Sequence, residues 1–115
     1  MMFQPMAFRN NFVAGITELL ILSFLRKEDN YIYEISKSIQ VFSQGRLSIS
    51  QNTLYSATYK LENEGYISEY SKKVGRKRVR VYYKLEPSGE EYLNRIRENY
   101  EDVFHGTENI LKELD

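Results

Sequence analysis

The sequence predicts a mainly α-helical α+β fold, with one small domain followed by a long C-terminal helix. Apolar residues recur at helical spacing over most of the first 65 residues, and they alternate with polar ones between residues 66 and 85. Helical spacing returns from residue 87 to the end. Because 115 residues suffice for one domain with a modest core, we divide the chain into an N-terminal arm (1–11), a folded domain (12–86) and a C-terminal helix (87–115).

The composition excludes several classes of protein. The sequence has no cysteine, so disulfides, thiolate metal sites and cysteine nucleophiles are excluded, which fits a reducing cytoplasm. The N-terminus has no signal-peptide pattern, and the longest apolar run, Leu19 to Leu25, is too short to span a bilayer. We therefore expect a cytoplasmic protein that does not bind a membrane.

The charges are unevenly distributed, although the net charge is zero. Residues 1–85 carry 13 basic and 7 acidic side chains, whereas residues 86–115 carry 3 and 9. The two parts therefore have net charges of +6 and −6. A basic body next to an acidic helix indicates a localised surface for a polyanion and a separate element with another role.

Two helices open the folded domain. The first is predicted from Phe12 to Lys27, and we expect it to be central and mostly buried because Leu22 and Leu25 widen its apolar face. That face comprises Phe12, Ile16, Leu19, Leu20, Ser23 and Phe24. The second helix is predicted from Tyr31 to about Ser43, and its inward residues are Ile35, Ile39 and Phe42. A turn and a short extended piece at Leu47–Ile49 lead to the third helix.

The third helix is predicted within Ser48–Gly65, with recognisable ends. Ser48 and Gln51 fit a capping box, Ser50 is an alternative N-cap, and Gly65 fits a left-handed residue after the helix. One narrow apolar stripe contains Leu54, Ala57, Thr58 and Leu61. The opposite face carries polar and aromatic side chains, namely Gln51, Asn52, Tyr55, Ser56, Tyr59 and Lys60. Such a helix can pack by one side and offer hydrogen-bonding groups from the other.

A β-hairpin with a basic tip follows the third helix. Its strands are predicted at Tyr66–Tyr70 and Val79–Leu85, and Gly75 permits the tight turn between them. Six cations lie within nine residues, namely Lys72, Lys73, Arg76, Lys77, Arg78 and Arg80. Three short helices followed by a basic hairpin match the winged helix-turn-helix pattern. A polar helix face or a charged run alone is most often solvated surface, but the combination favours binding to double-stranded DNA.

The chemistry of the side chains assigns a role to each predicted DNA contact. Gln51, Asn52 and Ser56 would read base edges, because amides and hydroxyls match the donors and acceptors of the major groove. Hydroxyls and cations on the third helix and the hairpin would hold phosphates. The full predicted set is Lys37, Ser50, Gln51, Asn52, Thr53, Tyr55, Ser56, Tyr59, Lys60, Lys73, Arg76, Lys77 and Arg78.

The C-terminal helix, which begins at Pro87, predicts a homodimer. Apolar residues repeat along it with 3-4 spacing, as in a coiled-coil seam, and the domain is too small to cover the whole seam. The alternative is packing within one chain, on the first helix. The predicted interface contains Phe12, Ile16, Leu93, Ile96, Tyr100, Val103, Ile110 and Leu114. A two-fold dimer would place two reading helices on symmetric half-sites.

Apolar and aromatic residues near this interface could line a pocket for a flat ligand. They are Phe8, Phe12, Tyr92, Ile96, Tyr100 and Phe104, and from spacing alone a plain interface core is the favoured reading. Nothing in the sequence favours catalysis, a cofactor or a metal. His105 is the only histidine, and the sequence has no glycine-rich phosphate loop and no nucleophile–base set.

Four strings of residues together resemble the PadR family of bacterial transcriptional regulators. Residues 31–35 (YIYEI) are similar to its Tyr-Gly-Tyr-Glu-Ile string. Residues 47–55 resemble its recognition-helix motif, and residues 61–67 resemble its Leu-Glu-x-x-Gly-x-Ile. Residues 78–85 with Gly89 resemble the end of its wing, so the likeness spans about residues 16–97. Ile32, Asn52 and Glu86 depart from the pattern.

The resemblance implies a winged-helix dimer, generally a repressor, that leaves its operator when a small aromatic or amphipathic effector binds. A single C-terminal helix resembles the smaller subclass, in which an aromatic residue of that helix sandwiches a flat ligand across the dimer axis. By position the match is Tyr100, although the usual tryptophan is absent. The rival interpretations are a winged-helix protein-interaction module without DNA binding and a ligand carrier without regulatory output.

Overall fold

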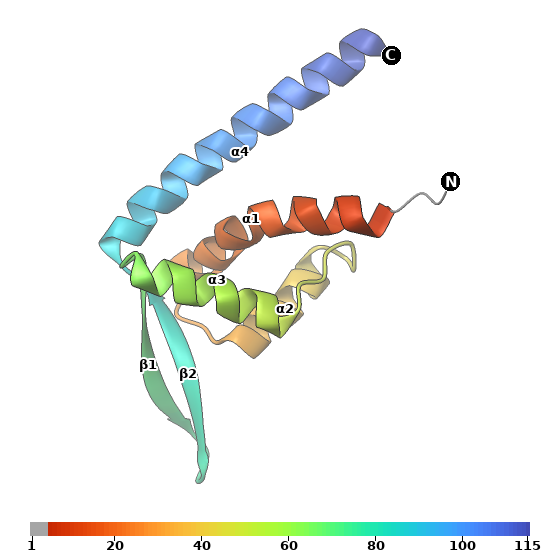
Figure 1. The fold of residues 1–115 in the computed structure, drawn as a ribbon. Coiled ribbons are helices and arrows are strands. Elements are labelled where there is room, and N and C mark those ends of the chain that lie inside the picture. Colours follow the sequence, from red (N-terminus) through yellow and green to blue (C-terminus); the bar gives the residue numbers. More distant parts are fainter. Residues whose placement is uncertain (1–4) are drawn as a thin grey trace.

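The computed structural model describes residues 5–115 and confirms the mainly helical α+β fold. The elements are α1 (Pro5–Lys27), α2 (Ile32–Phe42), α3 (Gln51–Asn63), β1 (Ile67–Val74), β2 (Arg78–Leu85) and α4 (Pro87–Leu114). The first three helices form one body, the β-hairpin projects from one end of it, and α4 leaves in another direction (Figure 1). This is the order of elements in a winged helix-turn-helix domain.

Helix α1 differs from the prediction in its start and in its buried face. It begins at Pro5, so the predicted arm is helical where it is described, and residues 1–4 of that arm lie outside the described residues. The buried stripe is Thr17, Ile21, Leu22 and Leu25, and it does not contain Phe12, which is 63% exposed. The Thr17 hydroxyl donates to the Val13 carbonyl at 2.8 Å, so it is satisfied inside the core.

Helix α2 packs through Ile32, Ile35 and Ile39, as its periodicity predicts for the last two. The inward placement of Phe42 was wrong, because this residue ends the helix with 75% of its surface exposed. Its ring instead lies 5.6 Å from that of Phe24. Positive φ angles at Gln44 and Gly45 then turn the chain toward α3.

Helix α3 begins at the alternative N-cap and ends as predicted. The Ser50 hydroxyl accepts from the Thr53 amide at 3.2 Å, so the capping box built on Ser48 was wrong. At the other end Gly65 has a φ of 78°, its amide donates to Glu62, and the Tyr66 amide donates to Leu61. These paired bonds form a Schellman motif, which releases the chain directly into β1.

The hairpin is longer than the alternation predicted. Strands β1 and β2 pair antiparallel from Ile67↔Leu85 to Val74↔Arg78. An isolated bridge between Asn30 and Tyr83 adds a third backbone segment at the base, with bonds of 3.2 and 2.8 Å. This bridge ties the α1–α2 connection to β2, so the base of the hairpin is held on both sides.

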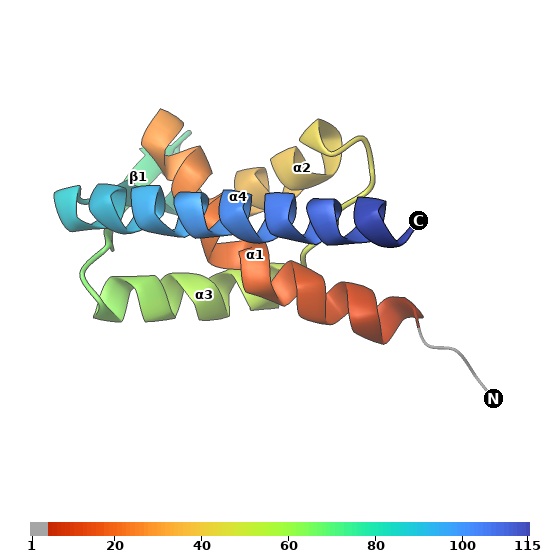
Figure 2. The same ribbon diagram turned by 90° about the horizontal axis from the view of Figure 1, so that it is seen from above.

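Helix α4 joins the body only through its first turns. Leu93 is fully buried in the core, so its predicted role as a dimer contact was wrong: its side chain has no surface to offer a partner. The helix continues past Gly106, and every residue after Ile96 up to Asp115 is exposed. Figure 2 shows α4 passing over α1, and the N-terminal half of α1 extending to the same side as the C-terminal half of α4.

Candidate nucleic-acid interface and effector groove

The outer face of α3 presents the predicted base-reading side chains. Leu54, Thr58 and Leu61 are buried beneath the helix. Because successive helical residues are 100° apart, Asn52, Ser56, Tyr59 and also Asn63 lie farthest from that stripe, and all four are exposed. Gln51 and Tyr55 flank this face on one side, while Thr53 and Lys60 flank it on the other. One exposed face therefore holds most of the predicted set.

The N-terminal end of α3 is free of negative charge. Its first turn contains no acidic residue, which suits the positive end of a helix dipole to an anion. Two predicted contacts are already engaged there, since the Ser50 hydroxyl lies 2.9 Å from that of Thr53. At the opposite end, burial raises the pKa of Glu62, and the neighbouring Glu69 raises it further. The first turn is therefore the part of α3 best suited to contact a polyanion.

Lys60 lies against α1. Its ammonium group lies 3.3 Å from a carboxylate oxygen of Glu18, although 71% of the lysine side chain is exposed. Because the lysine is open to solvent, while 21% of the Glu18 side chain is exposed, such an ion pair contributes only about 1 kcal/mol. The periodicity of α3 placed Lys60 on the polar face, but it contained no information about the acidic residue opposite. Lys37, also predicted as a phosphate contact, is exposed on α2.

The hairpin divides its cations between two settings. Lys73, Arg76, Lys77 and Arg78 are exposed toward the end of the hairpin, where Gly75 turns with a φ of 75°. The two others lie over aromatic rings: the Lys72 ammonium is 4.9 Å from the Tyr82 ring, and the Arg80 guanidinium is 4.4 Å from the Tyr31 ring. The sequence could not show this division, because it depends on which cations lie near the rings of Tyr31 and Tyr82 in the folded chain.

A groove of about 820 Å³ separates the exposed halves of α1 and α4. It is lined by all six residues of the predicted ligand pocket, namely Phe8, Phe12, Tyr92, Ile96, Tyr100 and Phe104. Two aromatic pairs line its walls, with ring centres 5.6 Å apart for Phe8 and Phe12 and 6.2 Å apart for Tyr100 and Phe104. The structure thus brings the whole predicted set together.

Glu18 is a groove residue that the sequence analysis missed. Its carboxylate accepts a 2.7 Å hydrogen bond from the Tyr92 hydroxyl and also pairs with Lys60, so it joins α1, α3 and α4. The hydrogen bond, followed by burial, raises the pKa of Tyr92 to about 12. A single acidic residue within an apolar helix carries no sequence signal for such contacts.

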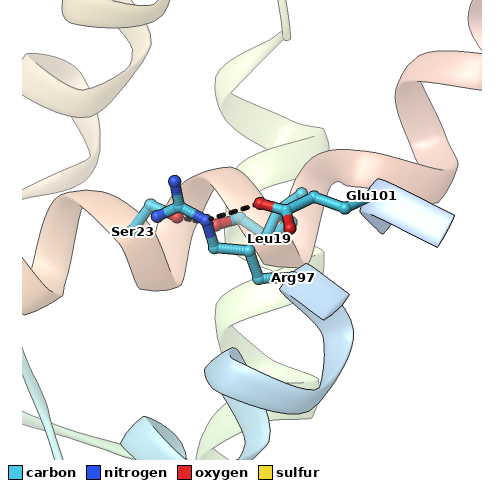
Figure 3. A network of polar contacts seen from close by, with 4 residues as sticks. All are labelled: Leu19, Ser23, Arg97 and Glu101. Atoms are coloured by element: carbon cyan, nitrogen blue, oxygen red, sulfur yellow. Dashed lines mark hydrogen bonds and ion pairs between the residues drawn. The ribbon is translucent and has the colours of Figure 1, made fainter. Parts of the chain in front are cut away.

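Helices α1 and α4 meet at the closed end of the groove. The rings of Tyr92 and Tyr66 stack with centres 4.3 Å apart and planes inclined by 8°, which joins α4 to the start of the hairpin. Further along α4, Arg97 contacts Glu101 at 3.5 Å, and Figure 3 shows this pair in front of Leu19 and Ser23 of α1. Beyond this point the helices diverge (Figure 1).

The apolar composition of α1 is relevant to the expectation that this protein does not bind a membrane. By length and composition alone, Met6–Lys27 could cross a bilayer, because its mean hydropathy reaches 1.2. The shorter apolar run Leu19–Leu25 did not predict this. The fold gives its apolar residues other roles. Ile21, Leu22 and Leu25 belong to the core, while Phe8 and Phe12 line the groove.

This chain is similar in sequence and structure to several known proteins. Residues 21–95 match the model of the transcriptional regulator PadR-like family. An uncharacterized protein of Lysinibacillus sphaericus is 28% identical over 95 residues, which cover 83% of this chain and 87% of that protein. The structure of a transcriptional regulator from Clostridium thermocellum is 35% identical with a TM-score of 0.76, and the match covers 81% of this chain and 90% of the other.

A structure with bound DNA is also similar. Bacillus subtilis PadR, solved in complex with operator DNA, is 26% identical with a TM-score of 0.64. The match covers 70% of this chain and 45% of that protein, so it concerns less than half of the larger relative.

Proposed function

The chain belongs to the PadR-like family of DNA-binding transcriptional regulators, and from this premise we propose that it acts as a homodimeric repressor released from its operator by a small aromatic or amphipathic compound. Membership in a family of regulators confirms that the chain is not an enzyme. It also supports a cytoplasmic location, where the DNA of a bacterial cell lies.

We propose that the outer face of α3 contacts the bases of the DNA and that the hairpin acts as the wing beside it. Asn52, Ser56 and Gln51 would contact base edges in the major groove, where amides pair well with adenine. Tyr55 and Tyr59, which are 48% and 69% exposed, would hold the backbone. Lys60 would reach a phosphate by leaving Glu18, which costs little because the lysine side chain is 71% exposed. The exposed wing cations would grip flanking phosphates or the minor groove.

Salt dependence tests the wing assignment. The wild type and the Arg76→Ala and Lys77→Ala variants are titrated at several salt concentrations with a duplex selected from a random pool. Each lost phosphate contact should lower the slope of log affinity against log salt by about 0.9. Lys112→Ala, on the distal part of α4, is the matched control and should leave the slope unchanged.

Two outcomes of this titration would count against the proposal. Unchanged slopes for both wing variants would remove the wing from the interface. If the wild type shows no salt-dependent binding to any duplex, the chain is instead a protein-interaction module that has lost DNA binding.

The proposed dimer rests on the exposed seam of α4. Four of its apolar residues, Tyr100, Val103, Ile110 and Leu114, are between 44% and 78% exposed in the single chain. The radius of gyration is 16.4 Å, whereas a compact domain of this length would have about 13 Å. A second copy that covers α4 and the N-terminal half of α1, including Phe12 and Ile16, would account for both features.

The proposed effector site is the α1–α4 groove, because its size and aromatic walls suit a flat compound. Flat aromatic compounds can be screened for release of a fluorescent operator duplex. Tyr100→Ala should then require roughly fivefold more compound, since one aromatic stacking contact is worth about 1 kcal/mol. Tyr33→Ala, on the exposed side of α2, is the control. An equal response of both variants would place the effector elsewhere.

A further inference from the structure

One face of the wing base carries a ladder of aromatic and charged side chains. The ring of Tyr82 lies 5.3 Å from that of Tyr31 and 5.8 Å from that of Tyr70. Arg80 lies over the Tyr31 ring and Lys72 over the Tyr82 ring. The Tyr70 hydroxyl donates to an Asp29 carboxylate oxygen at 2.7 Å, and this bond raises the pKa of Tyr70. Asp29 and Tyr31 belong to the α1–α2 connection, so the ladder joins that connection to both strands.

The register places the ladder on one side of the wing and the core contacts on the other. Tyr70 pairs with Tyr82 and Lys72 with Arg80, so all four share a face. Ile67 and Tyr83 lie on the opposite face and are buried in the core with α3. The wing base is therefore held between α3 and the α1–α2 connection, with the Asn30–Tyr83 bridge at its root. Only the outer part of the hairpin is free on both faces.

A two-stranded hairpin is marginal by itself, so its direction depends on what packs against its base. Each contact in the ladder is modest, since a single cation–π or aromatic pair is a weak interaction. Together they oppose a hinge motion that the core face alone would permit. A small rotation at the base moves the tip by a larger distance, because the paired strands are eight residues long and about 25 Å in length.

We propose that the ladder of Tyr31, Tyr70 and Tyr82 with Asp29, Lys72 and Arg80 is a positioning device that sets the angle of the wing relative to α3. The inference rests on the proposed DNA contact of the wing tip, and it divides the six wing cations by role. Lys72 and Arg80 orient the hairpin from its base, whereas Lys73, Arg76, Lys77 and Arg78 reach the phosphates. The hairpin then reaches DNA already oriented, which lowers the ordering cost of binding.

The first experiment measures the wing in the absence of DNA. Since the chain has no cysteine, spin labels can be attached selectively through Val41→Cys on α2 and Lys77→Cys at the wing tip. Dilution with excess unlabelled chain confines each measured distance to one protomer. Tyr31→Leu should broaden the distance distribution about twofold or shift its maximum, while Tyr31→Phe, which keeps the ring, should not. Tyr33→Leu is the matched control, because Tyr33 is outside the ladder and 56% exposed.

The second experiment separates positioning from direct contact. Arg80→Met should weaken binding to the selected duplex by no more than about fivefold while the salt slope stays at the wild-type value. Lys77→Ala should lower that slope by about 0.9. A reduced slope for Arg80→Met would make this residue a phosphate ligand and overturn the division of roles. An unchanged distance distribution in Tyr31→Leu would overturn the ladder whatever the DNA result, and an unchanged slope in Lys77→Ala would instead contradict the proposed wing contact.

Discussion

At the scale of the residue, Glu18 shows how one side chain can connect three elements. Its two carboxylate oxygens are engaged by Tyr92 of α4 and by Lys60 of α3. Tyr92 also lines the proposed effector groove, and Lys60 flanks the proposed reading face. A compound that displaces the Tyr92 hydroxyl would therefore change the surroundings of a lysine on the reading helix. Local periodicity could not indicate this connection, since Tyr92 is 74 residues from Glu18.

The raised pKa of Tyr92 predicts a pH dependence of stability. The folded chain holds the phenol proton more tightly than the unfolded chain, whose pKa is near 10. The stability from this contact is therefore fully present below pH 10 and is lost as the pH rises from 10 to about 12. Tyrosine-ring NMR should show one phenol titrating near 12 that is missing in Tyr92→Phe. Glu18→Gln should lower that pKa, and an ordinary value in the wild type would disprove the contact.

At the scale of the element, the root of α4 is fixed to the end of α3. The Ser88 hydroxyl donates to the Gly65 carbonyl at 2.9 Å, so it does not cap α4, and the Glu86 amide donates to the Tyr66 carbonyl at 3.0 Å. Gly89 is buried directly beneath that Tyr66 carbonyl, where a Cβ atom would collide with the backbone oxygen. A movement of α4 would therefore act on the C-terminal end of α3.

The close approach at Gly89 predicts opposite effects for two glycines of one helix. Gly89→Ala should lower the free energy of unfolding by about 1–3 kcal/mol, because a backbone carbonyl cannot yield as a flexible side chain can. Gly106→Ala meets nothing within 4 Å and should raise it by about 1 kcal/mol through helix propensity. Urea unfolding measures both. A harmless Gly89→Ala would mean that α4 does not pack this closely.

At the scale of the whole molecule, the single chain is too extended to cover its own apolar surface. Its longest dimension is 58 Å, and the distal part of α4 is exposed throughout. The same α4 carries most of the acidic excess of residues 86–115, while the hairpin, which holds the wing cations, points away from the distal part of α4 (Figure 1). The proposed dimer would thus separate an acidic association region from a basic DNA surface.

A charge placed in the proposed α4 interface tests the dimer. Sedimentation equilibrium of Val103→Glu should show a dimer dissociation constant that is raised at least tenfold, because a buried unpaired carboxylate costs several kcal/mol. His105→Glu places the same charge about 200° away around the helix and should leave the association unchanged. A wild type that is monomeric at micromolar concentration would refute the dimer directly.

The sequence by itself determined the features that depend on near neighbours. The order of elements, the apolar stripe of α3, the glycine after it and the basic hairpin all follow from spacing and turn chemistry within a few residues. The strings shared with the PadR family lie on these same features, which explains why they identified the family. The six residues that line the α1–α4 groove were also named as one set, because aromatic side chains stand out in the sequence pattern, while their role as an effector site stays a prediction.

The tertiary structure decided what depends on packing between distant segments. Helix α1 is apolar on more than one side, so only the arrangement of α2 and α3 could select Thr17, Ile21, Leu22 and Leu25 as its buried stripe. Leu93 belongs to the seam by spacing but to the core by position, since the root of α4 is covered by the body. Glu18 and Tyr31 acquire their partners only in the fold. Periodicity reports which faces can be buried, whereas contacts across the chain decide which of them are.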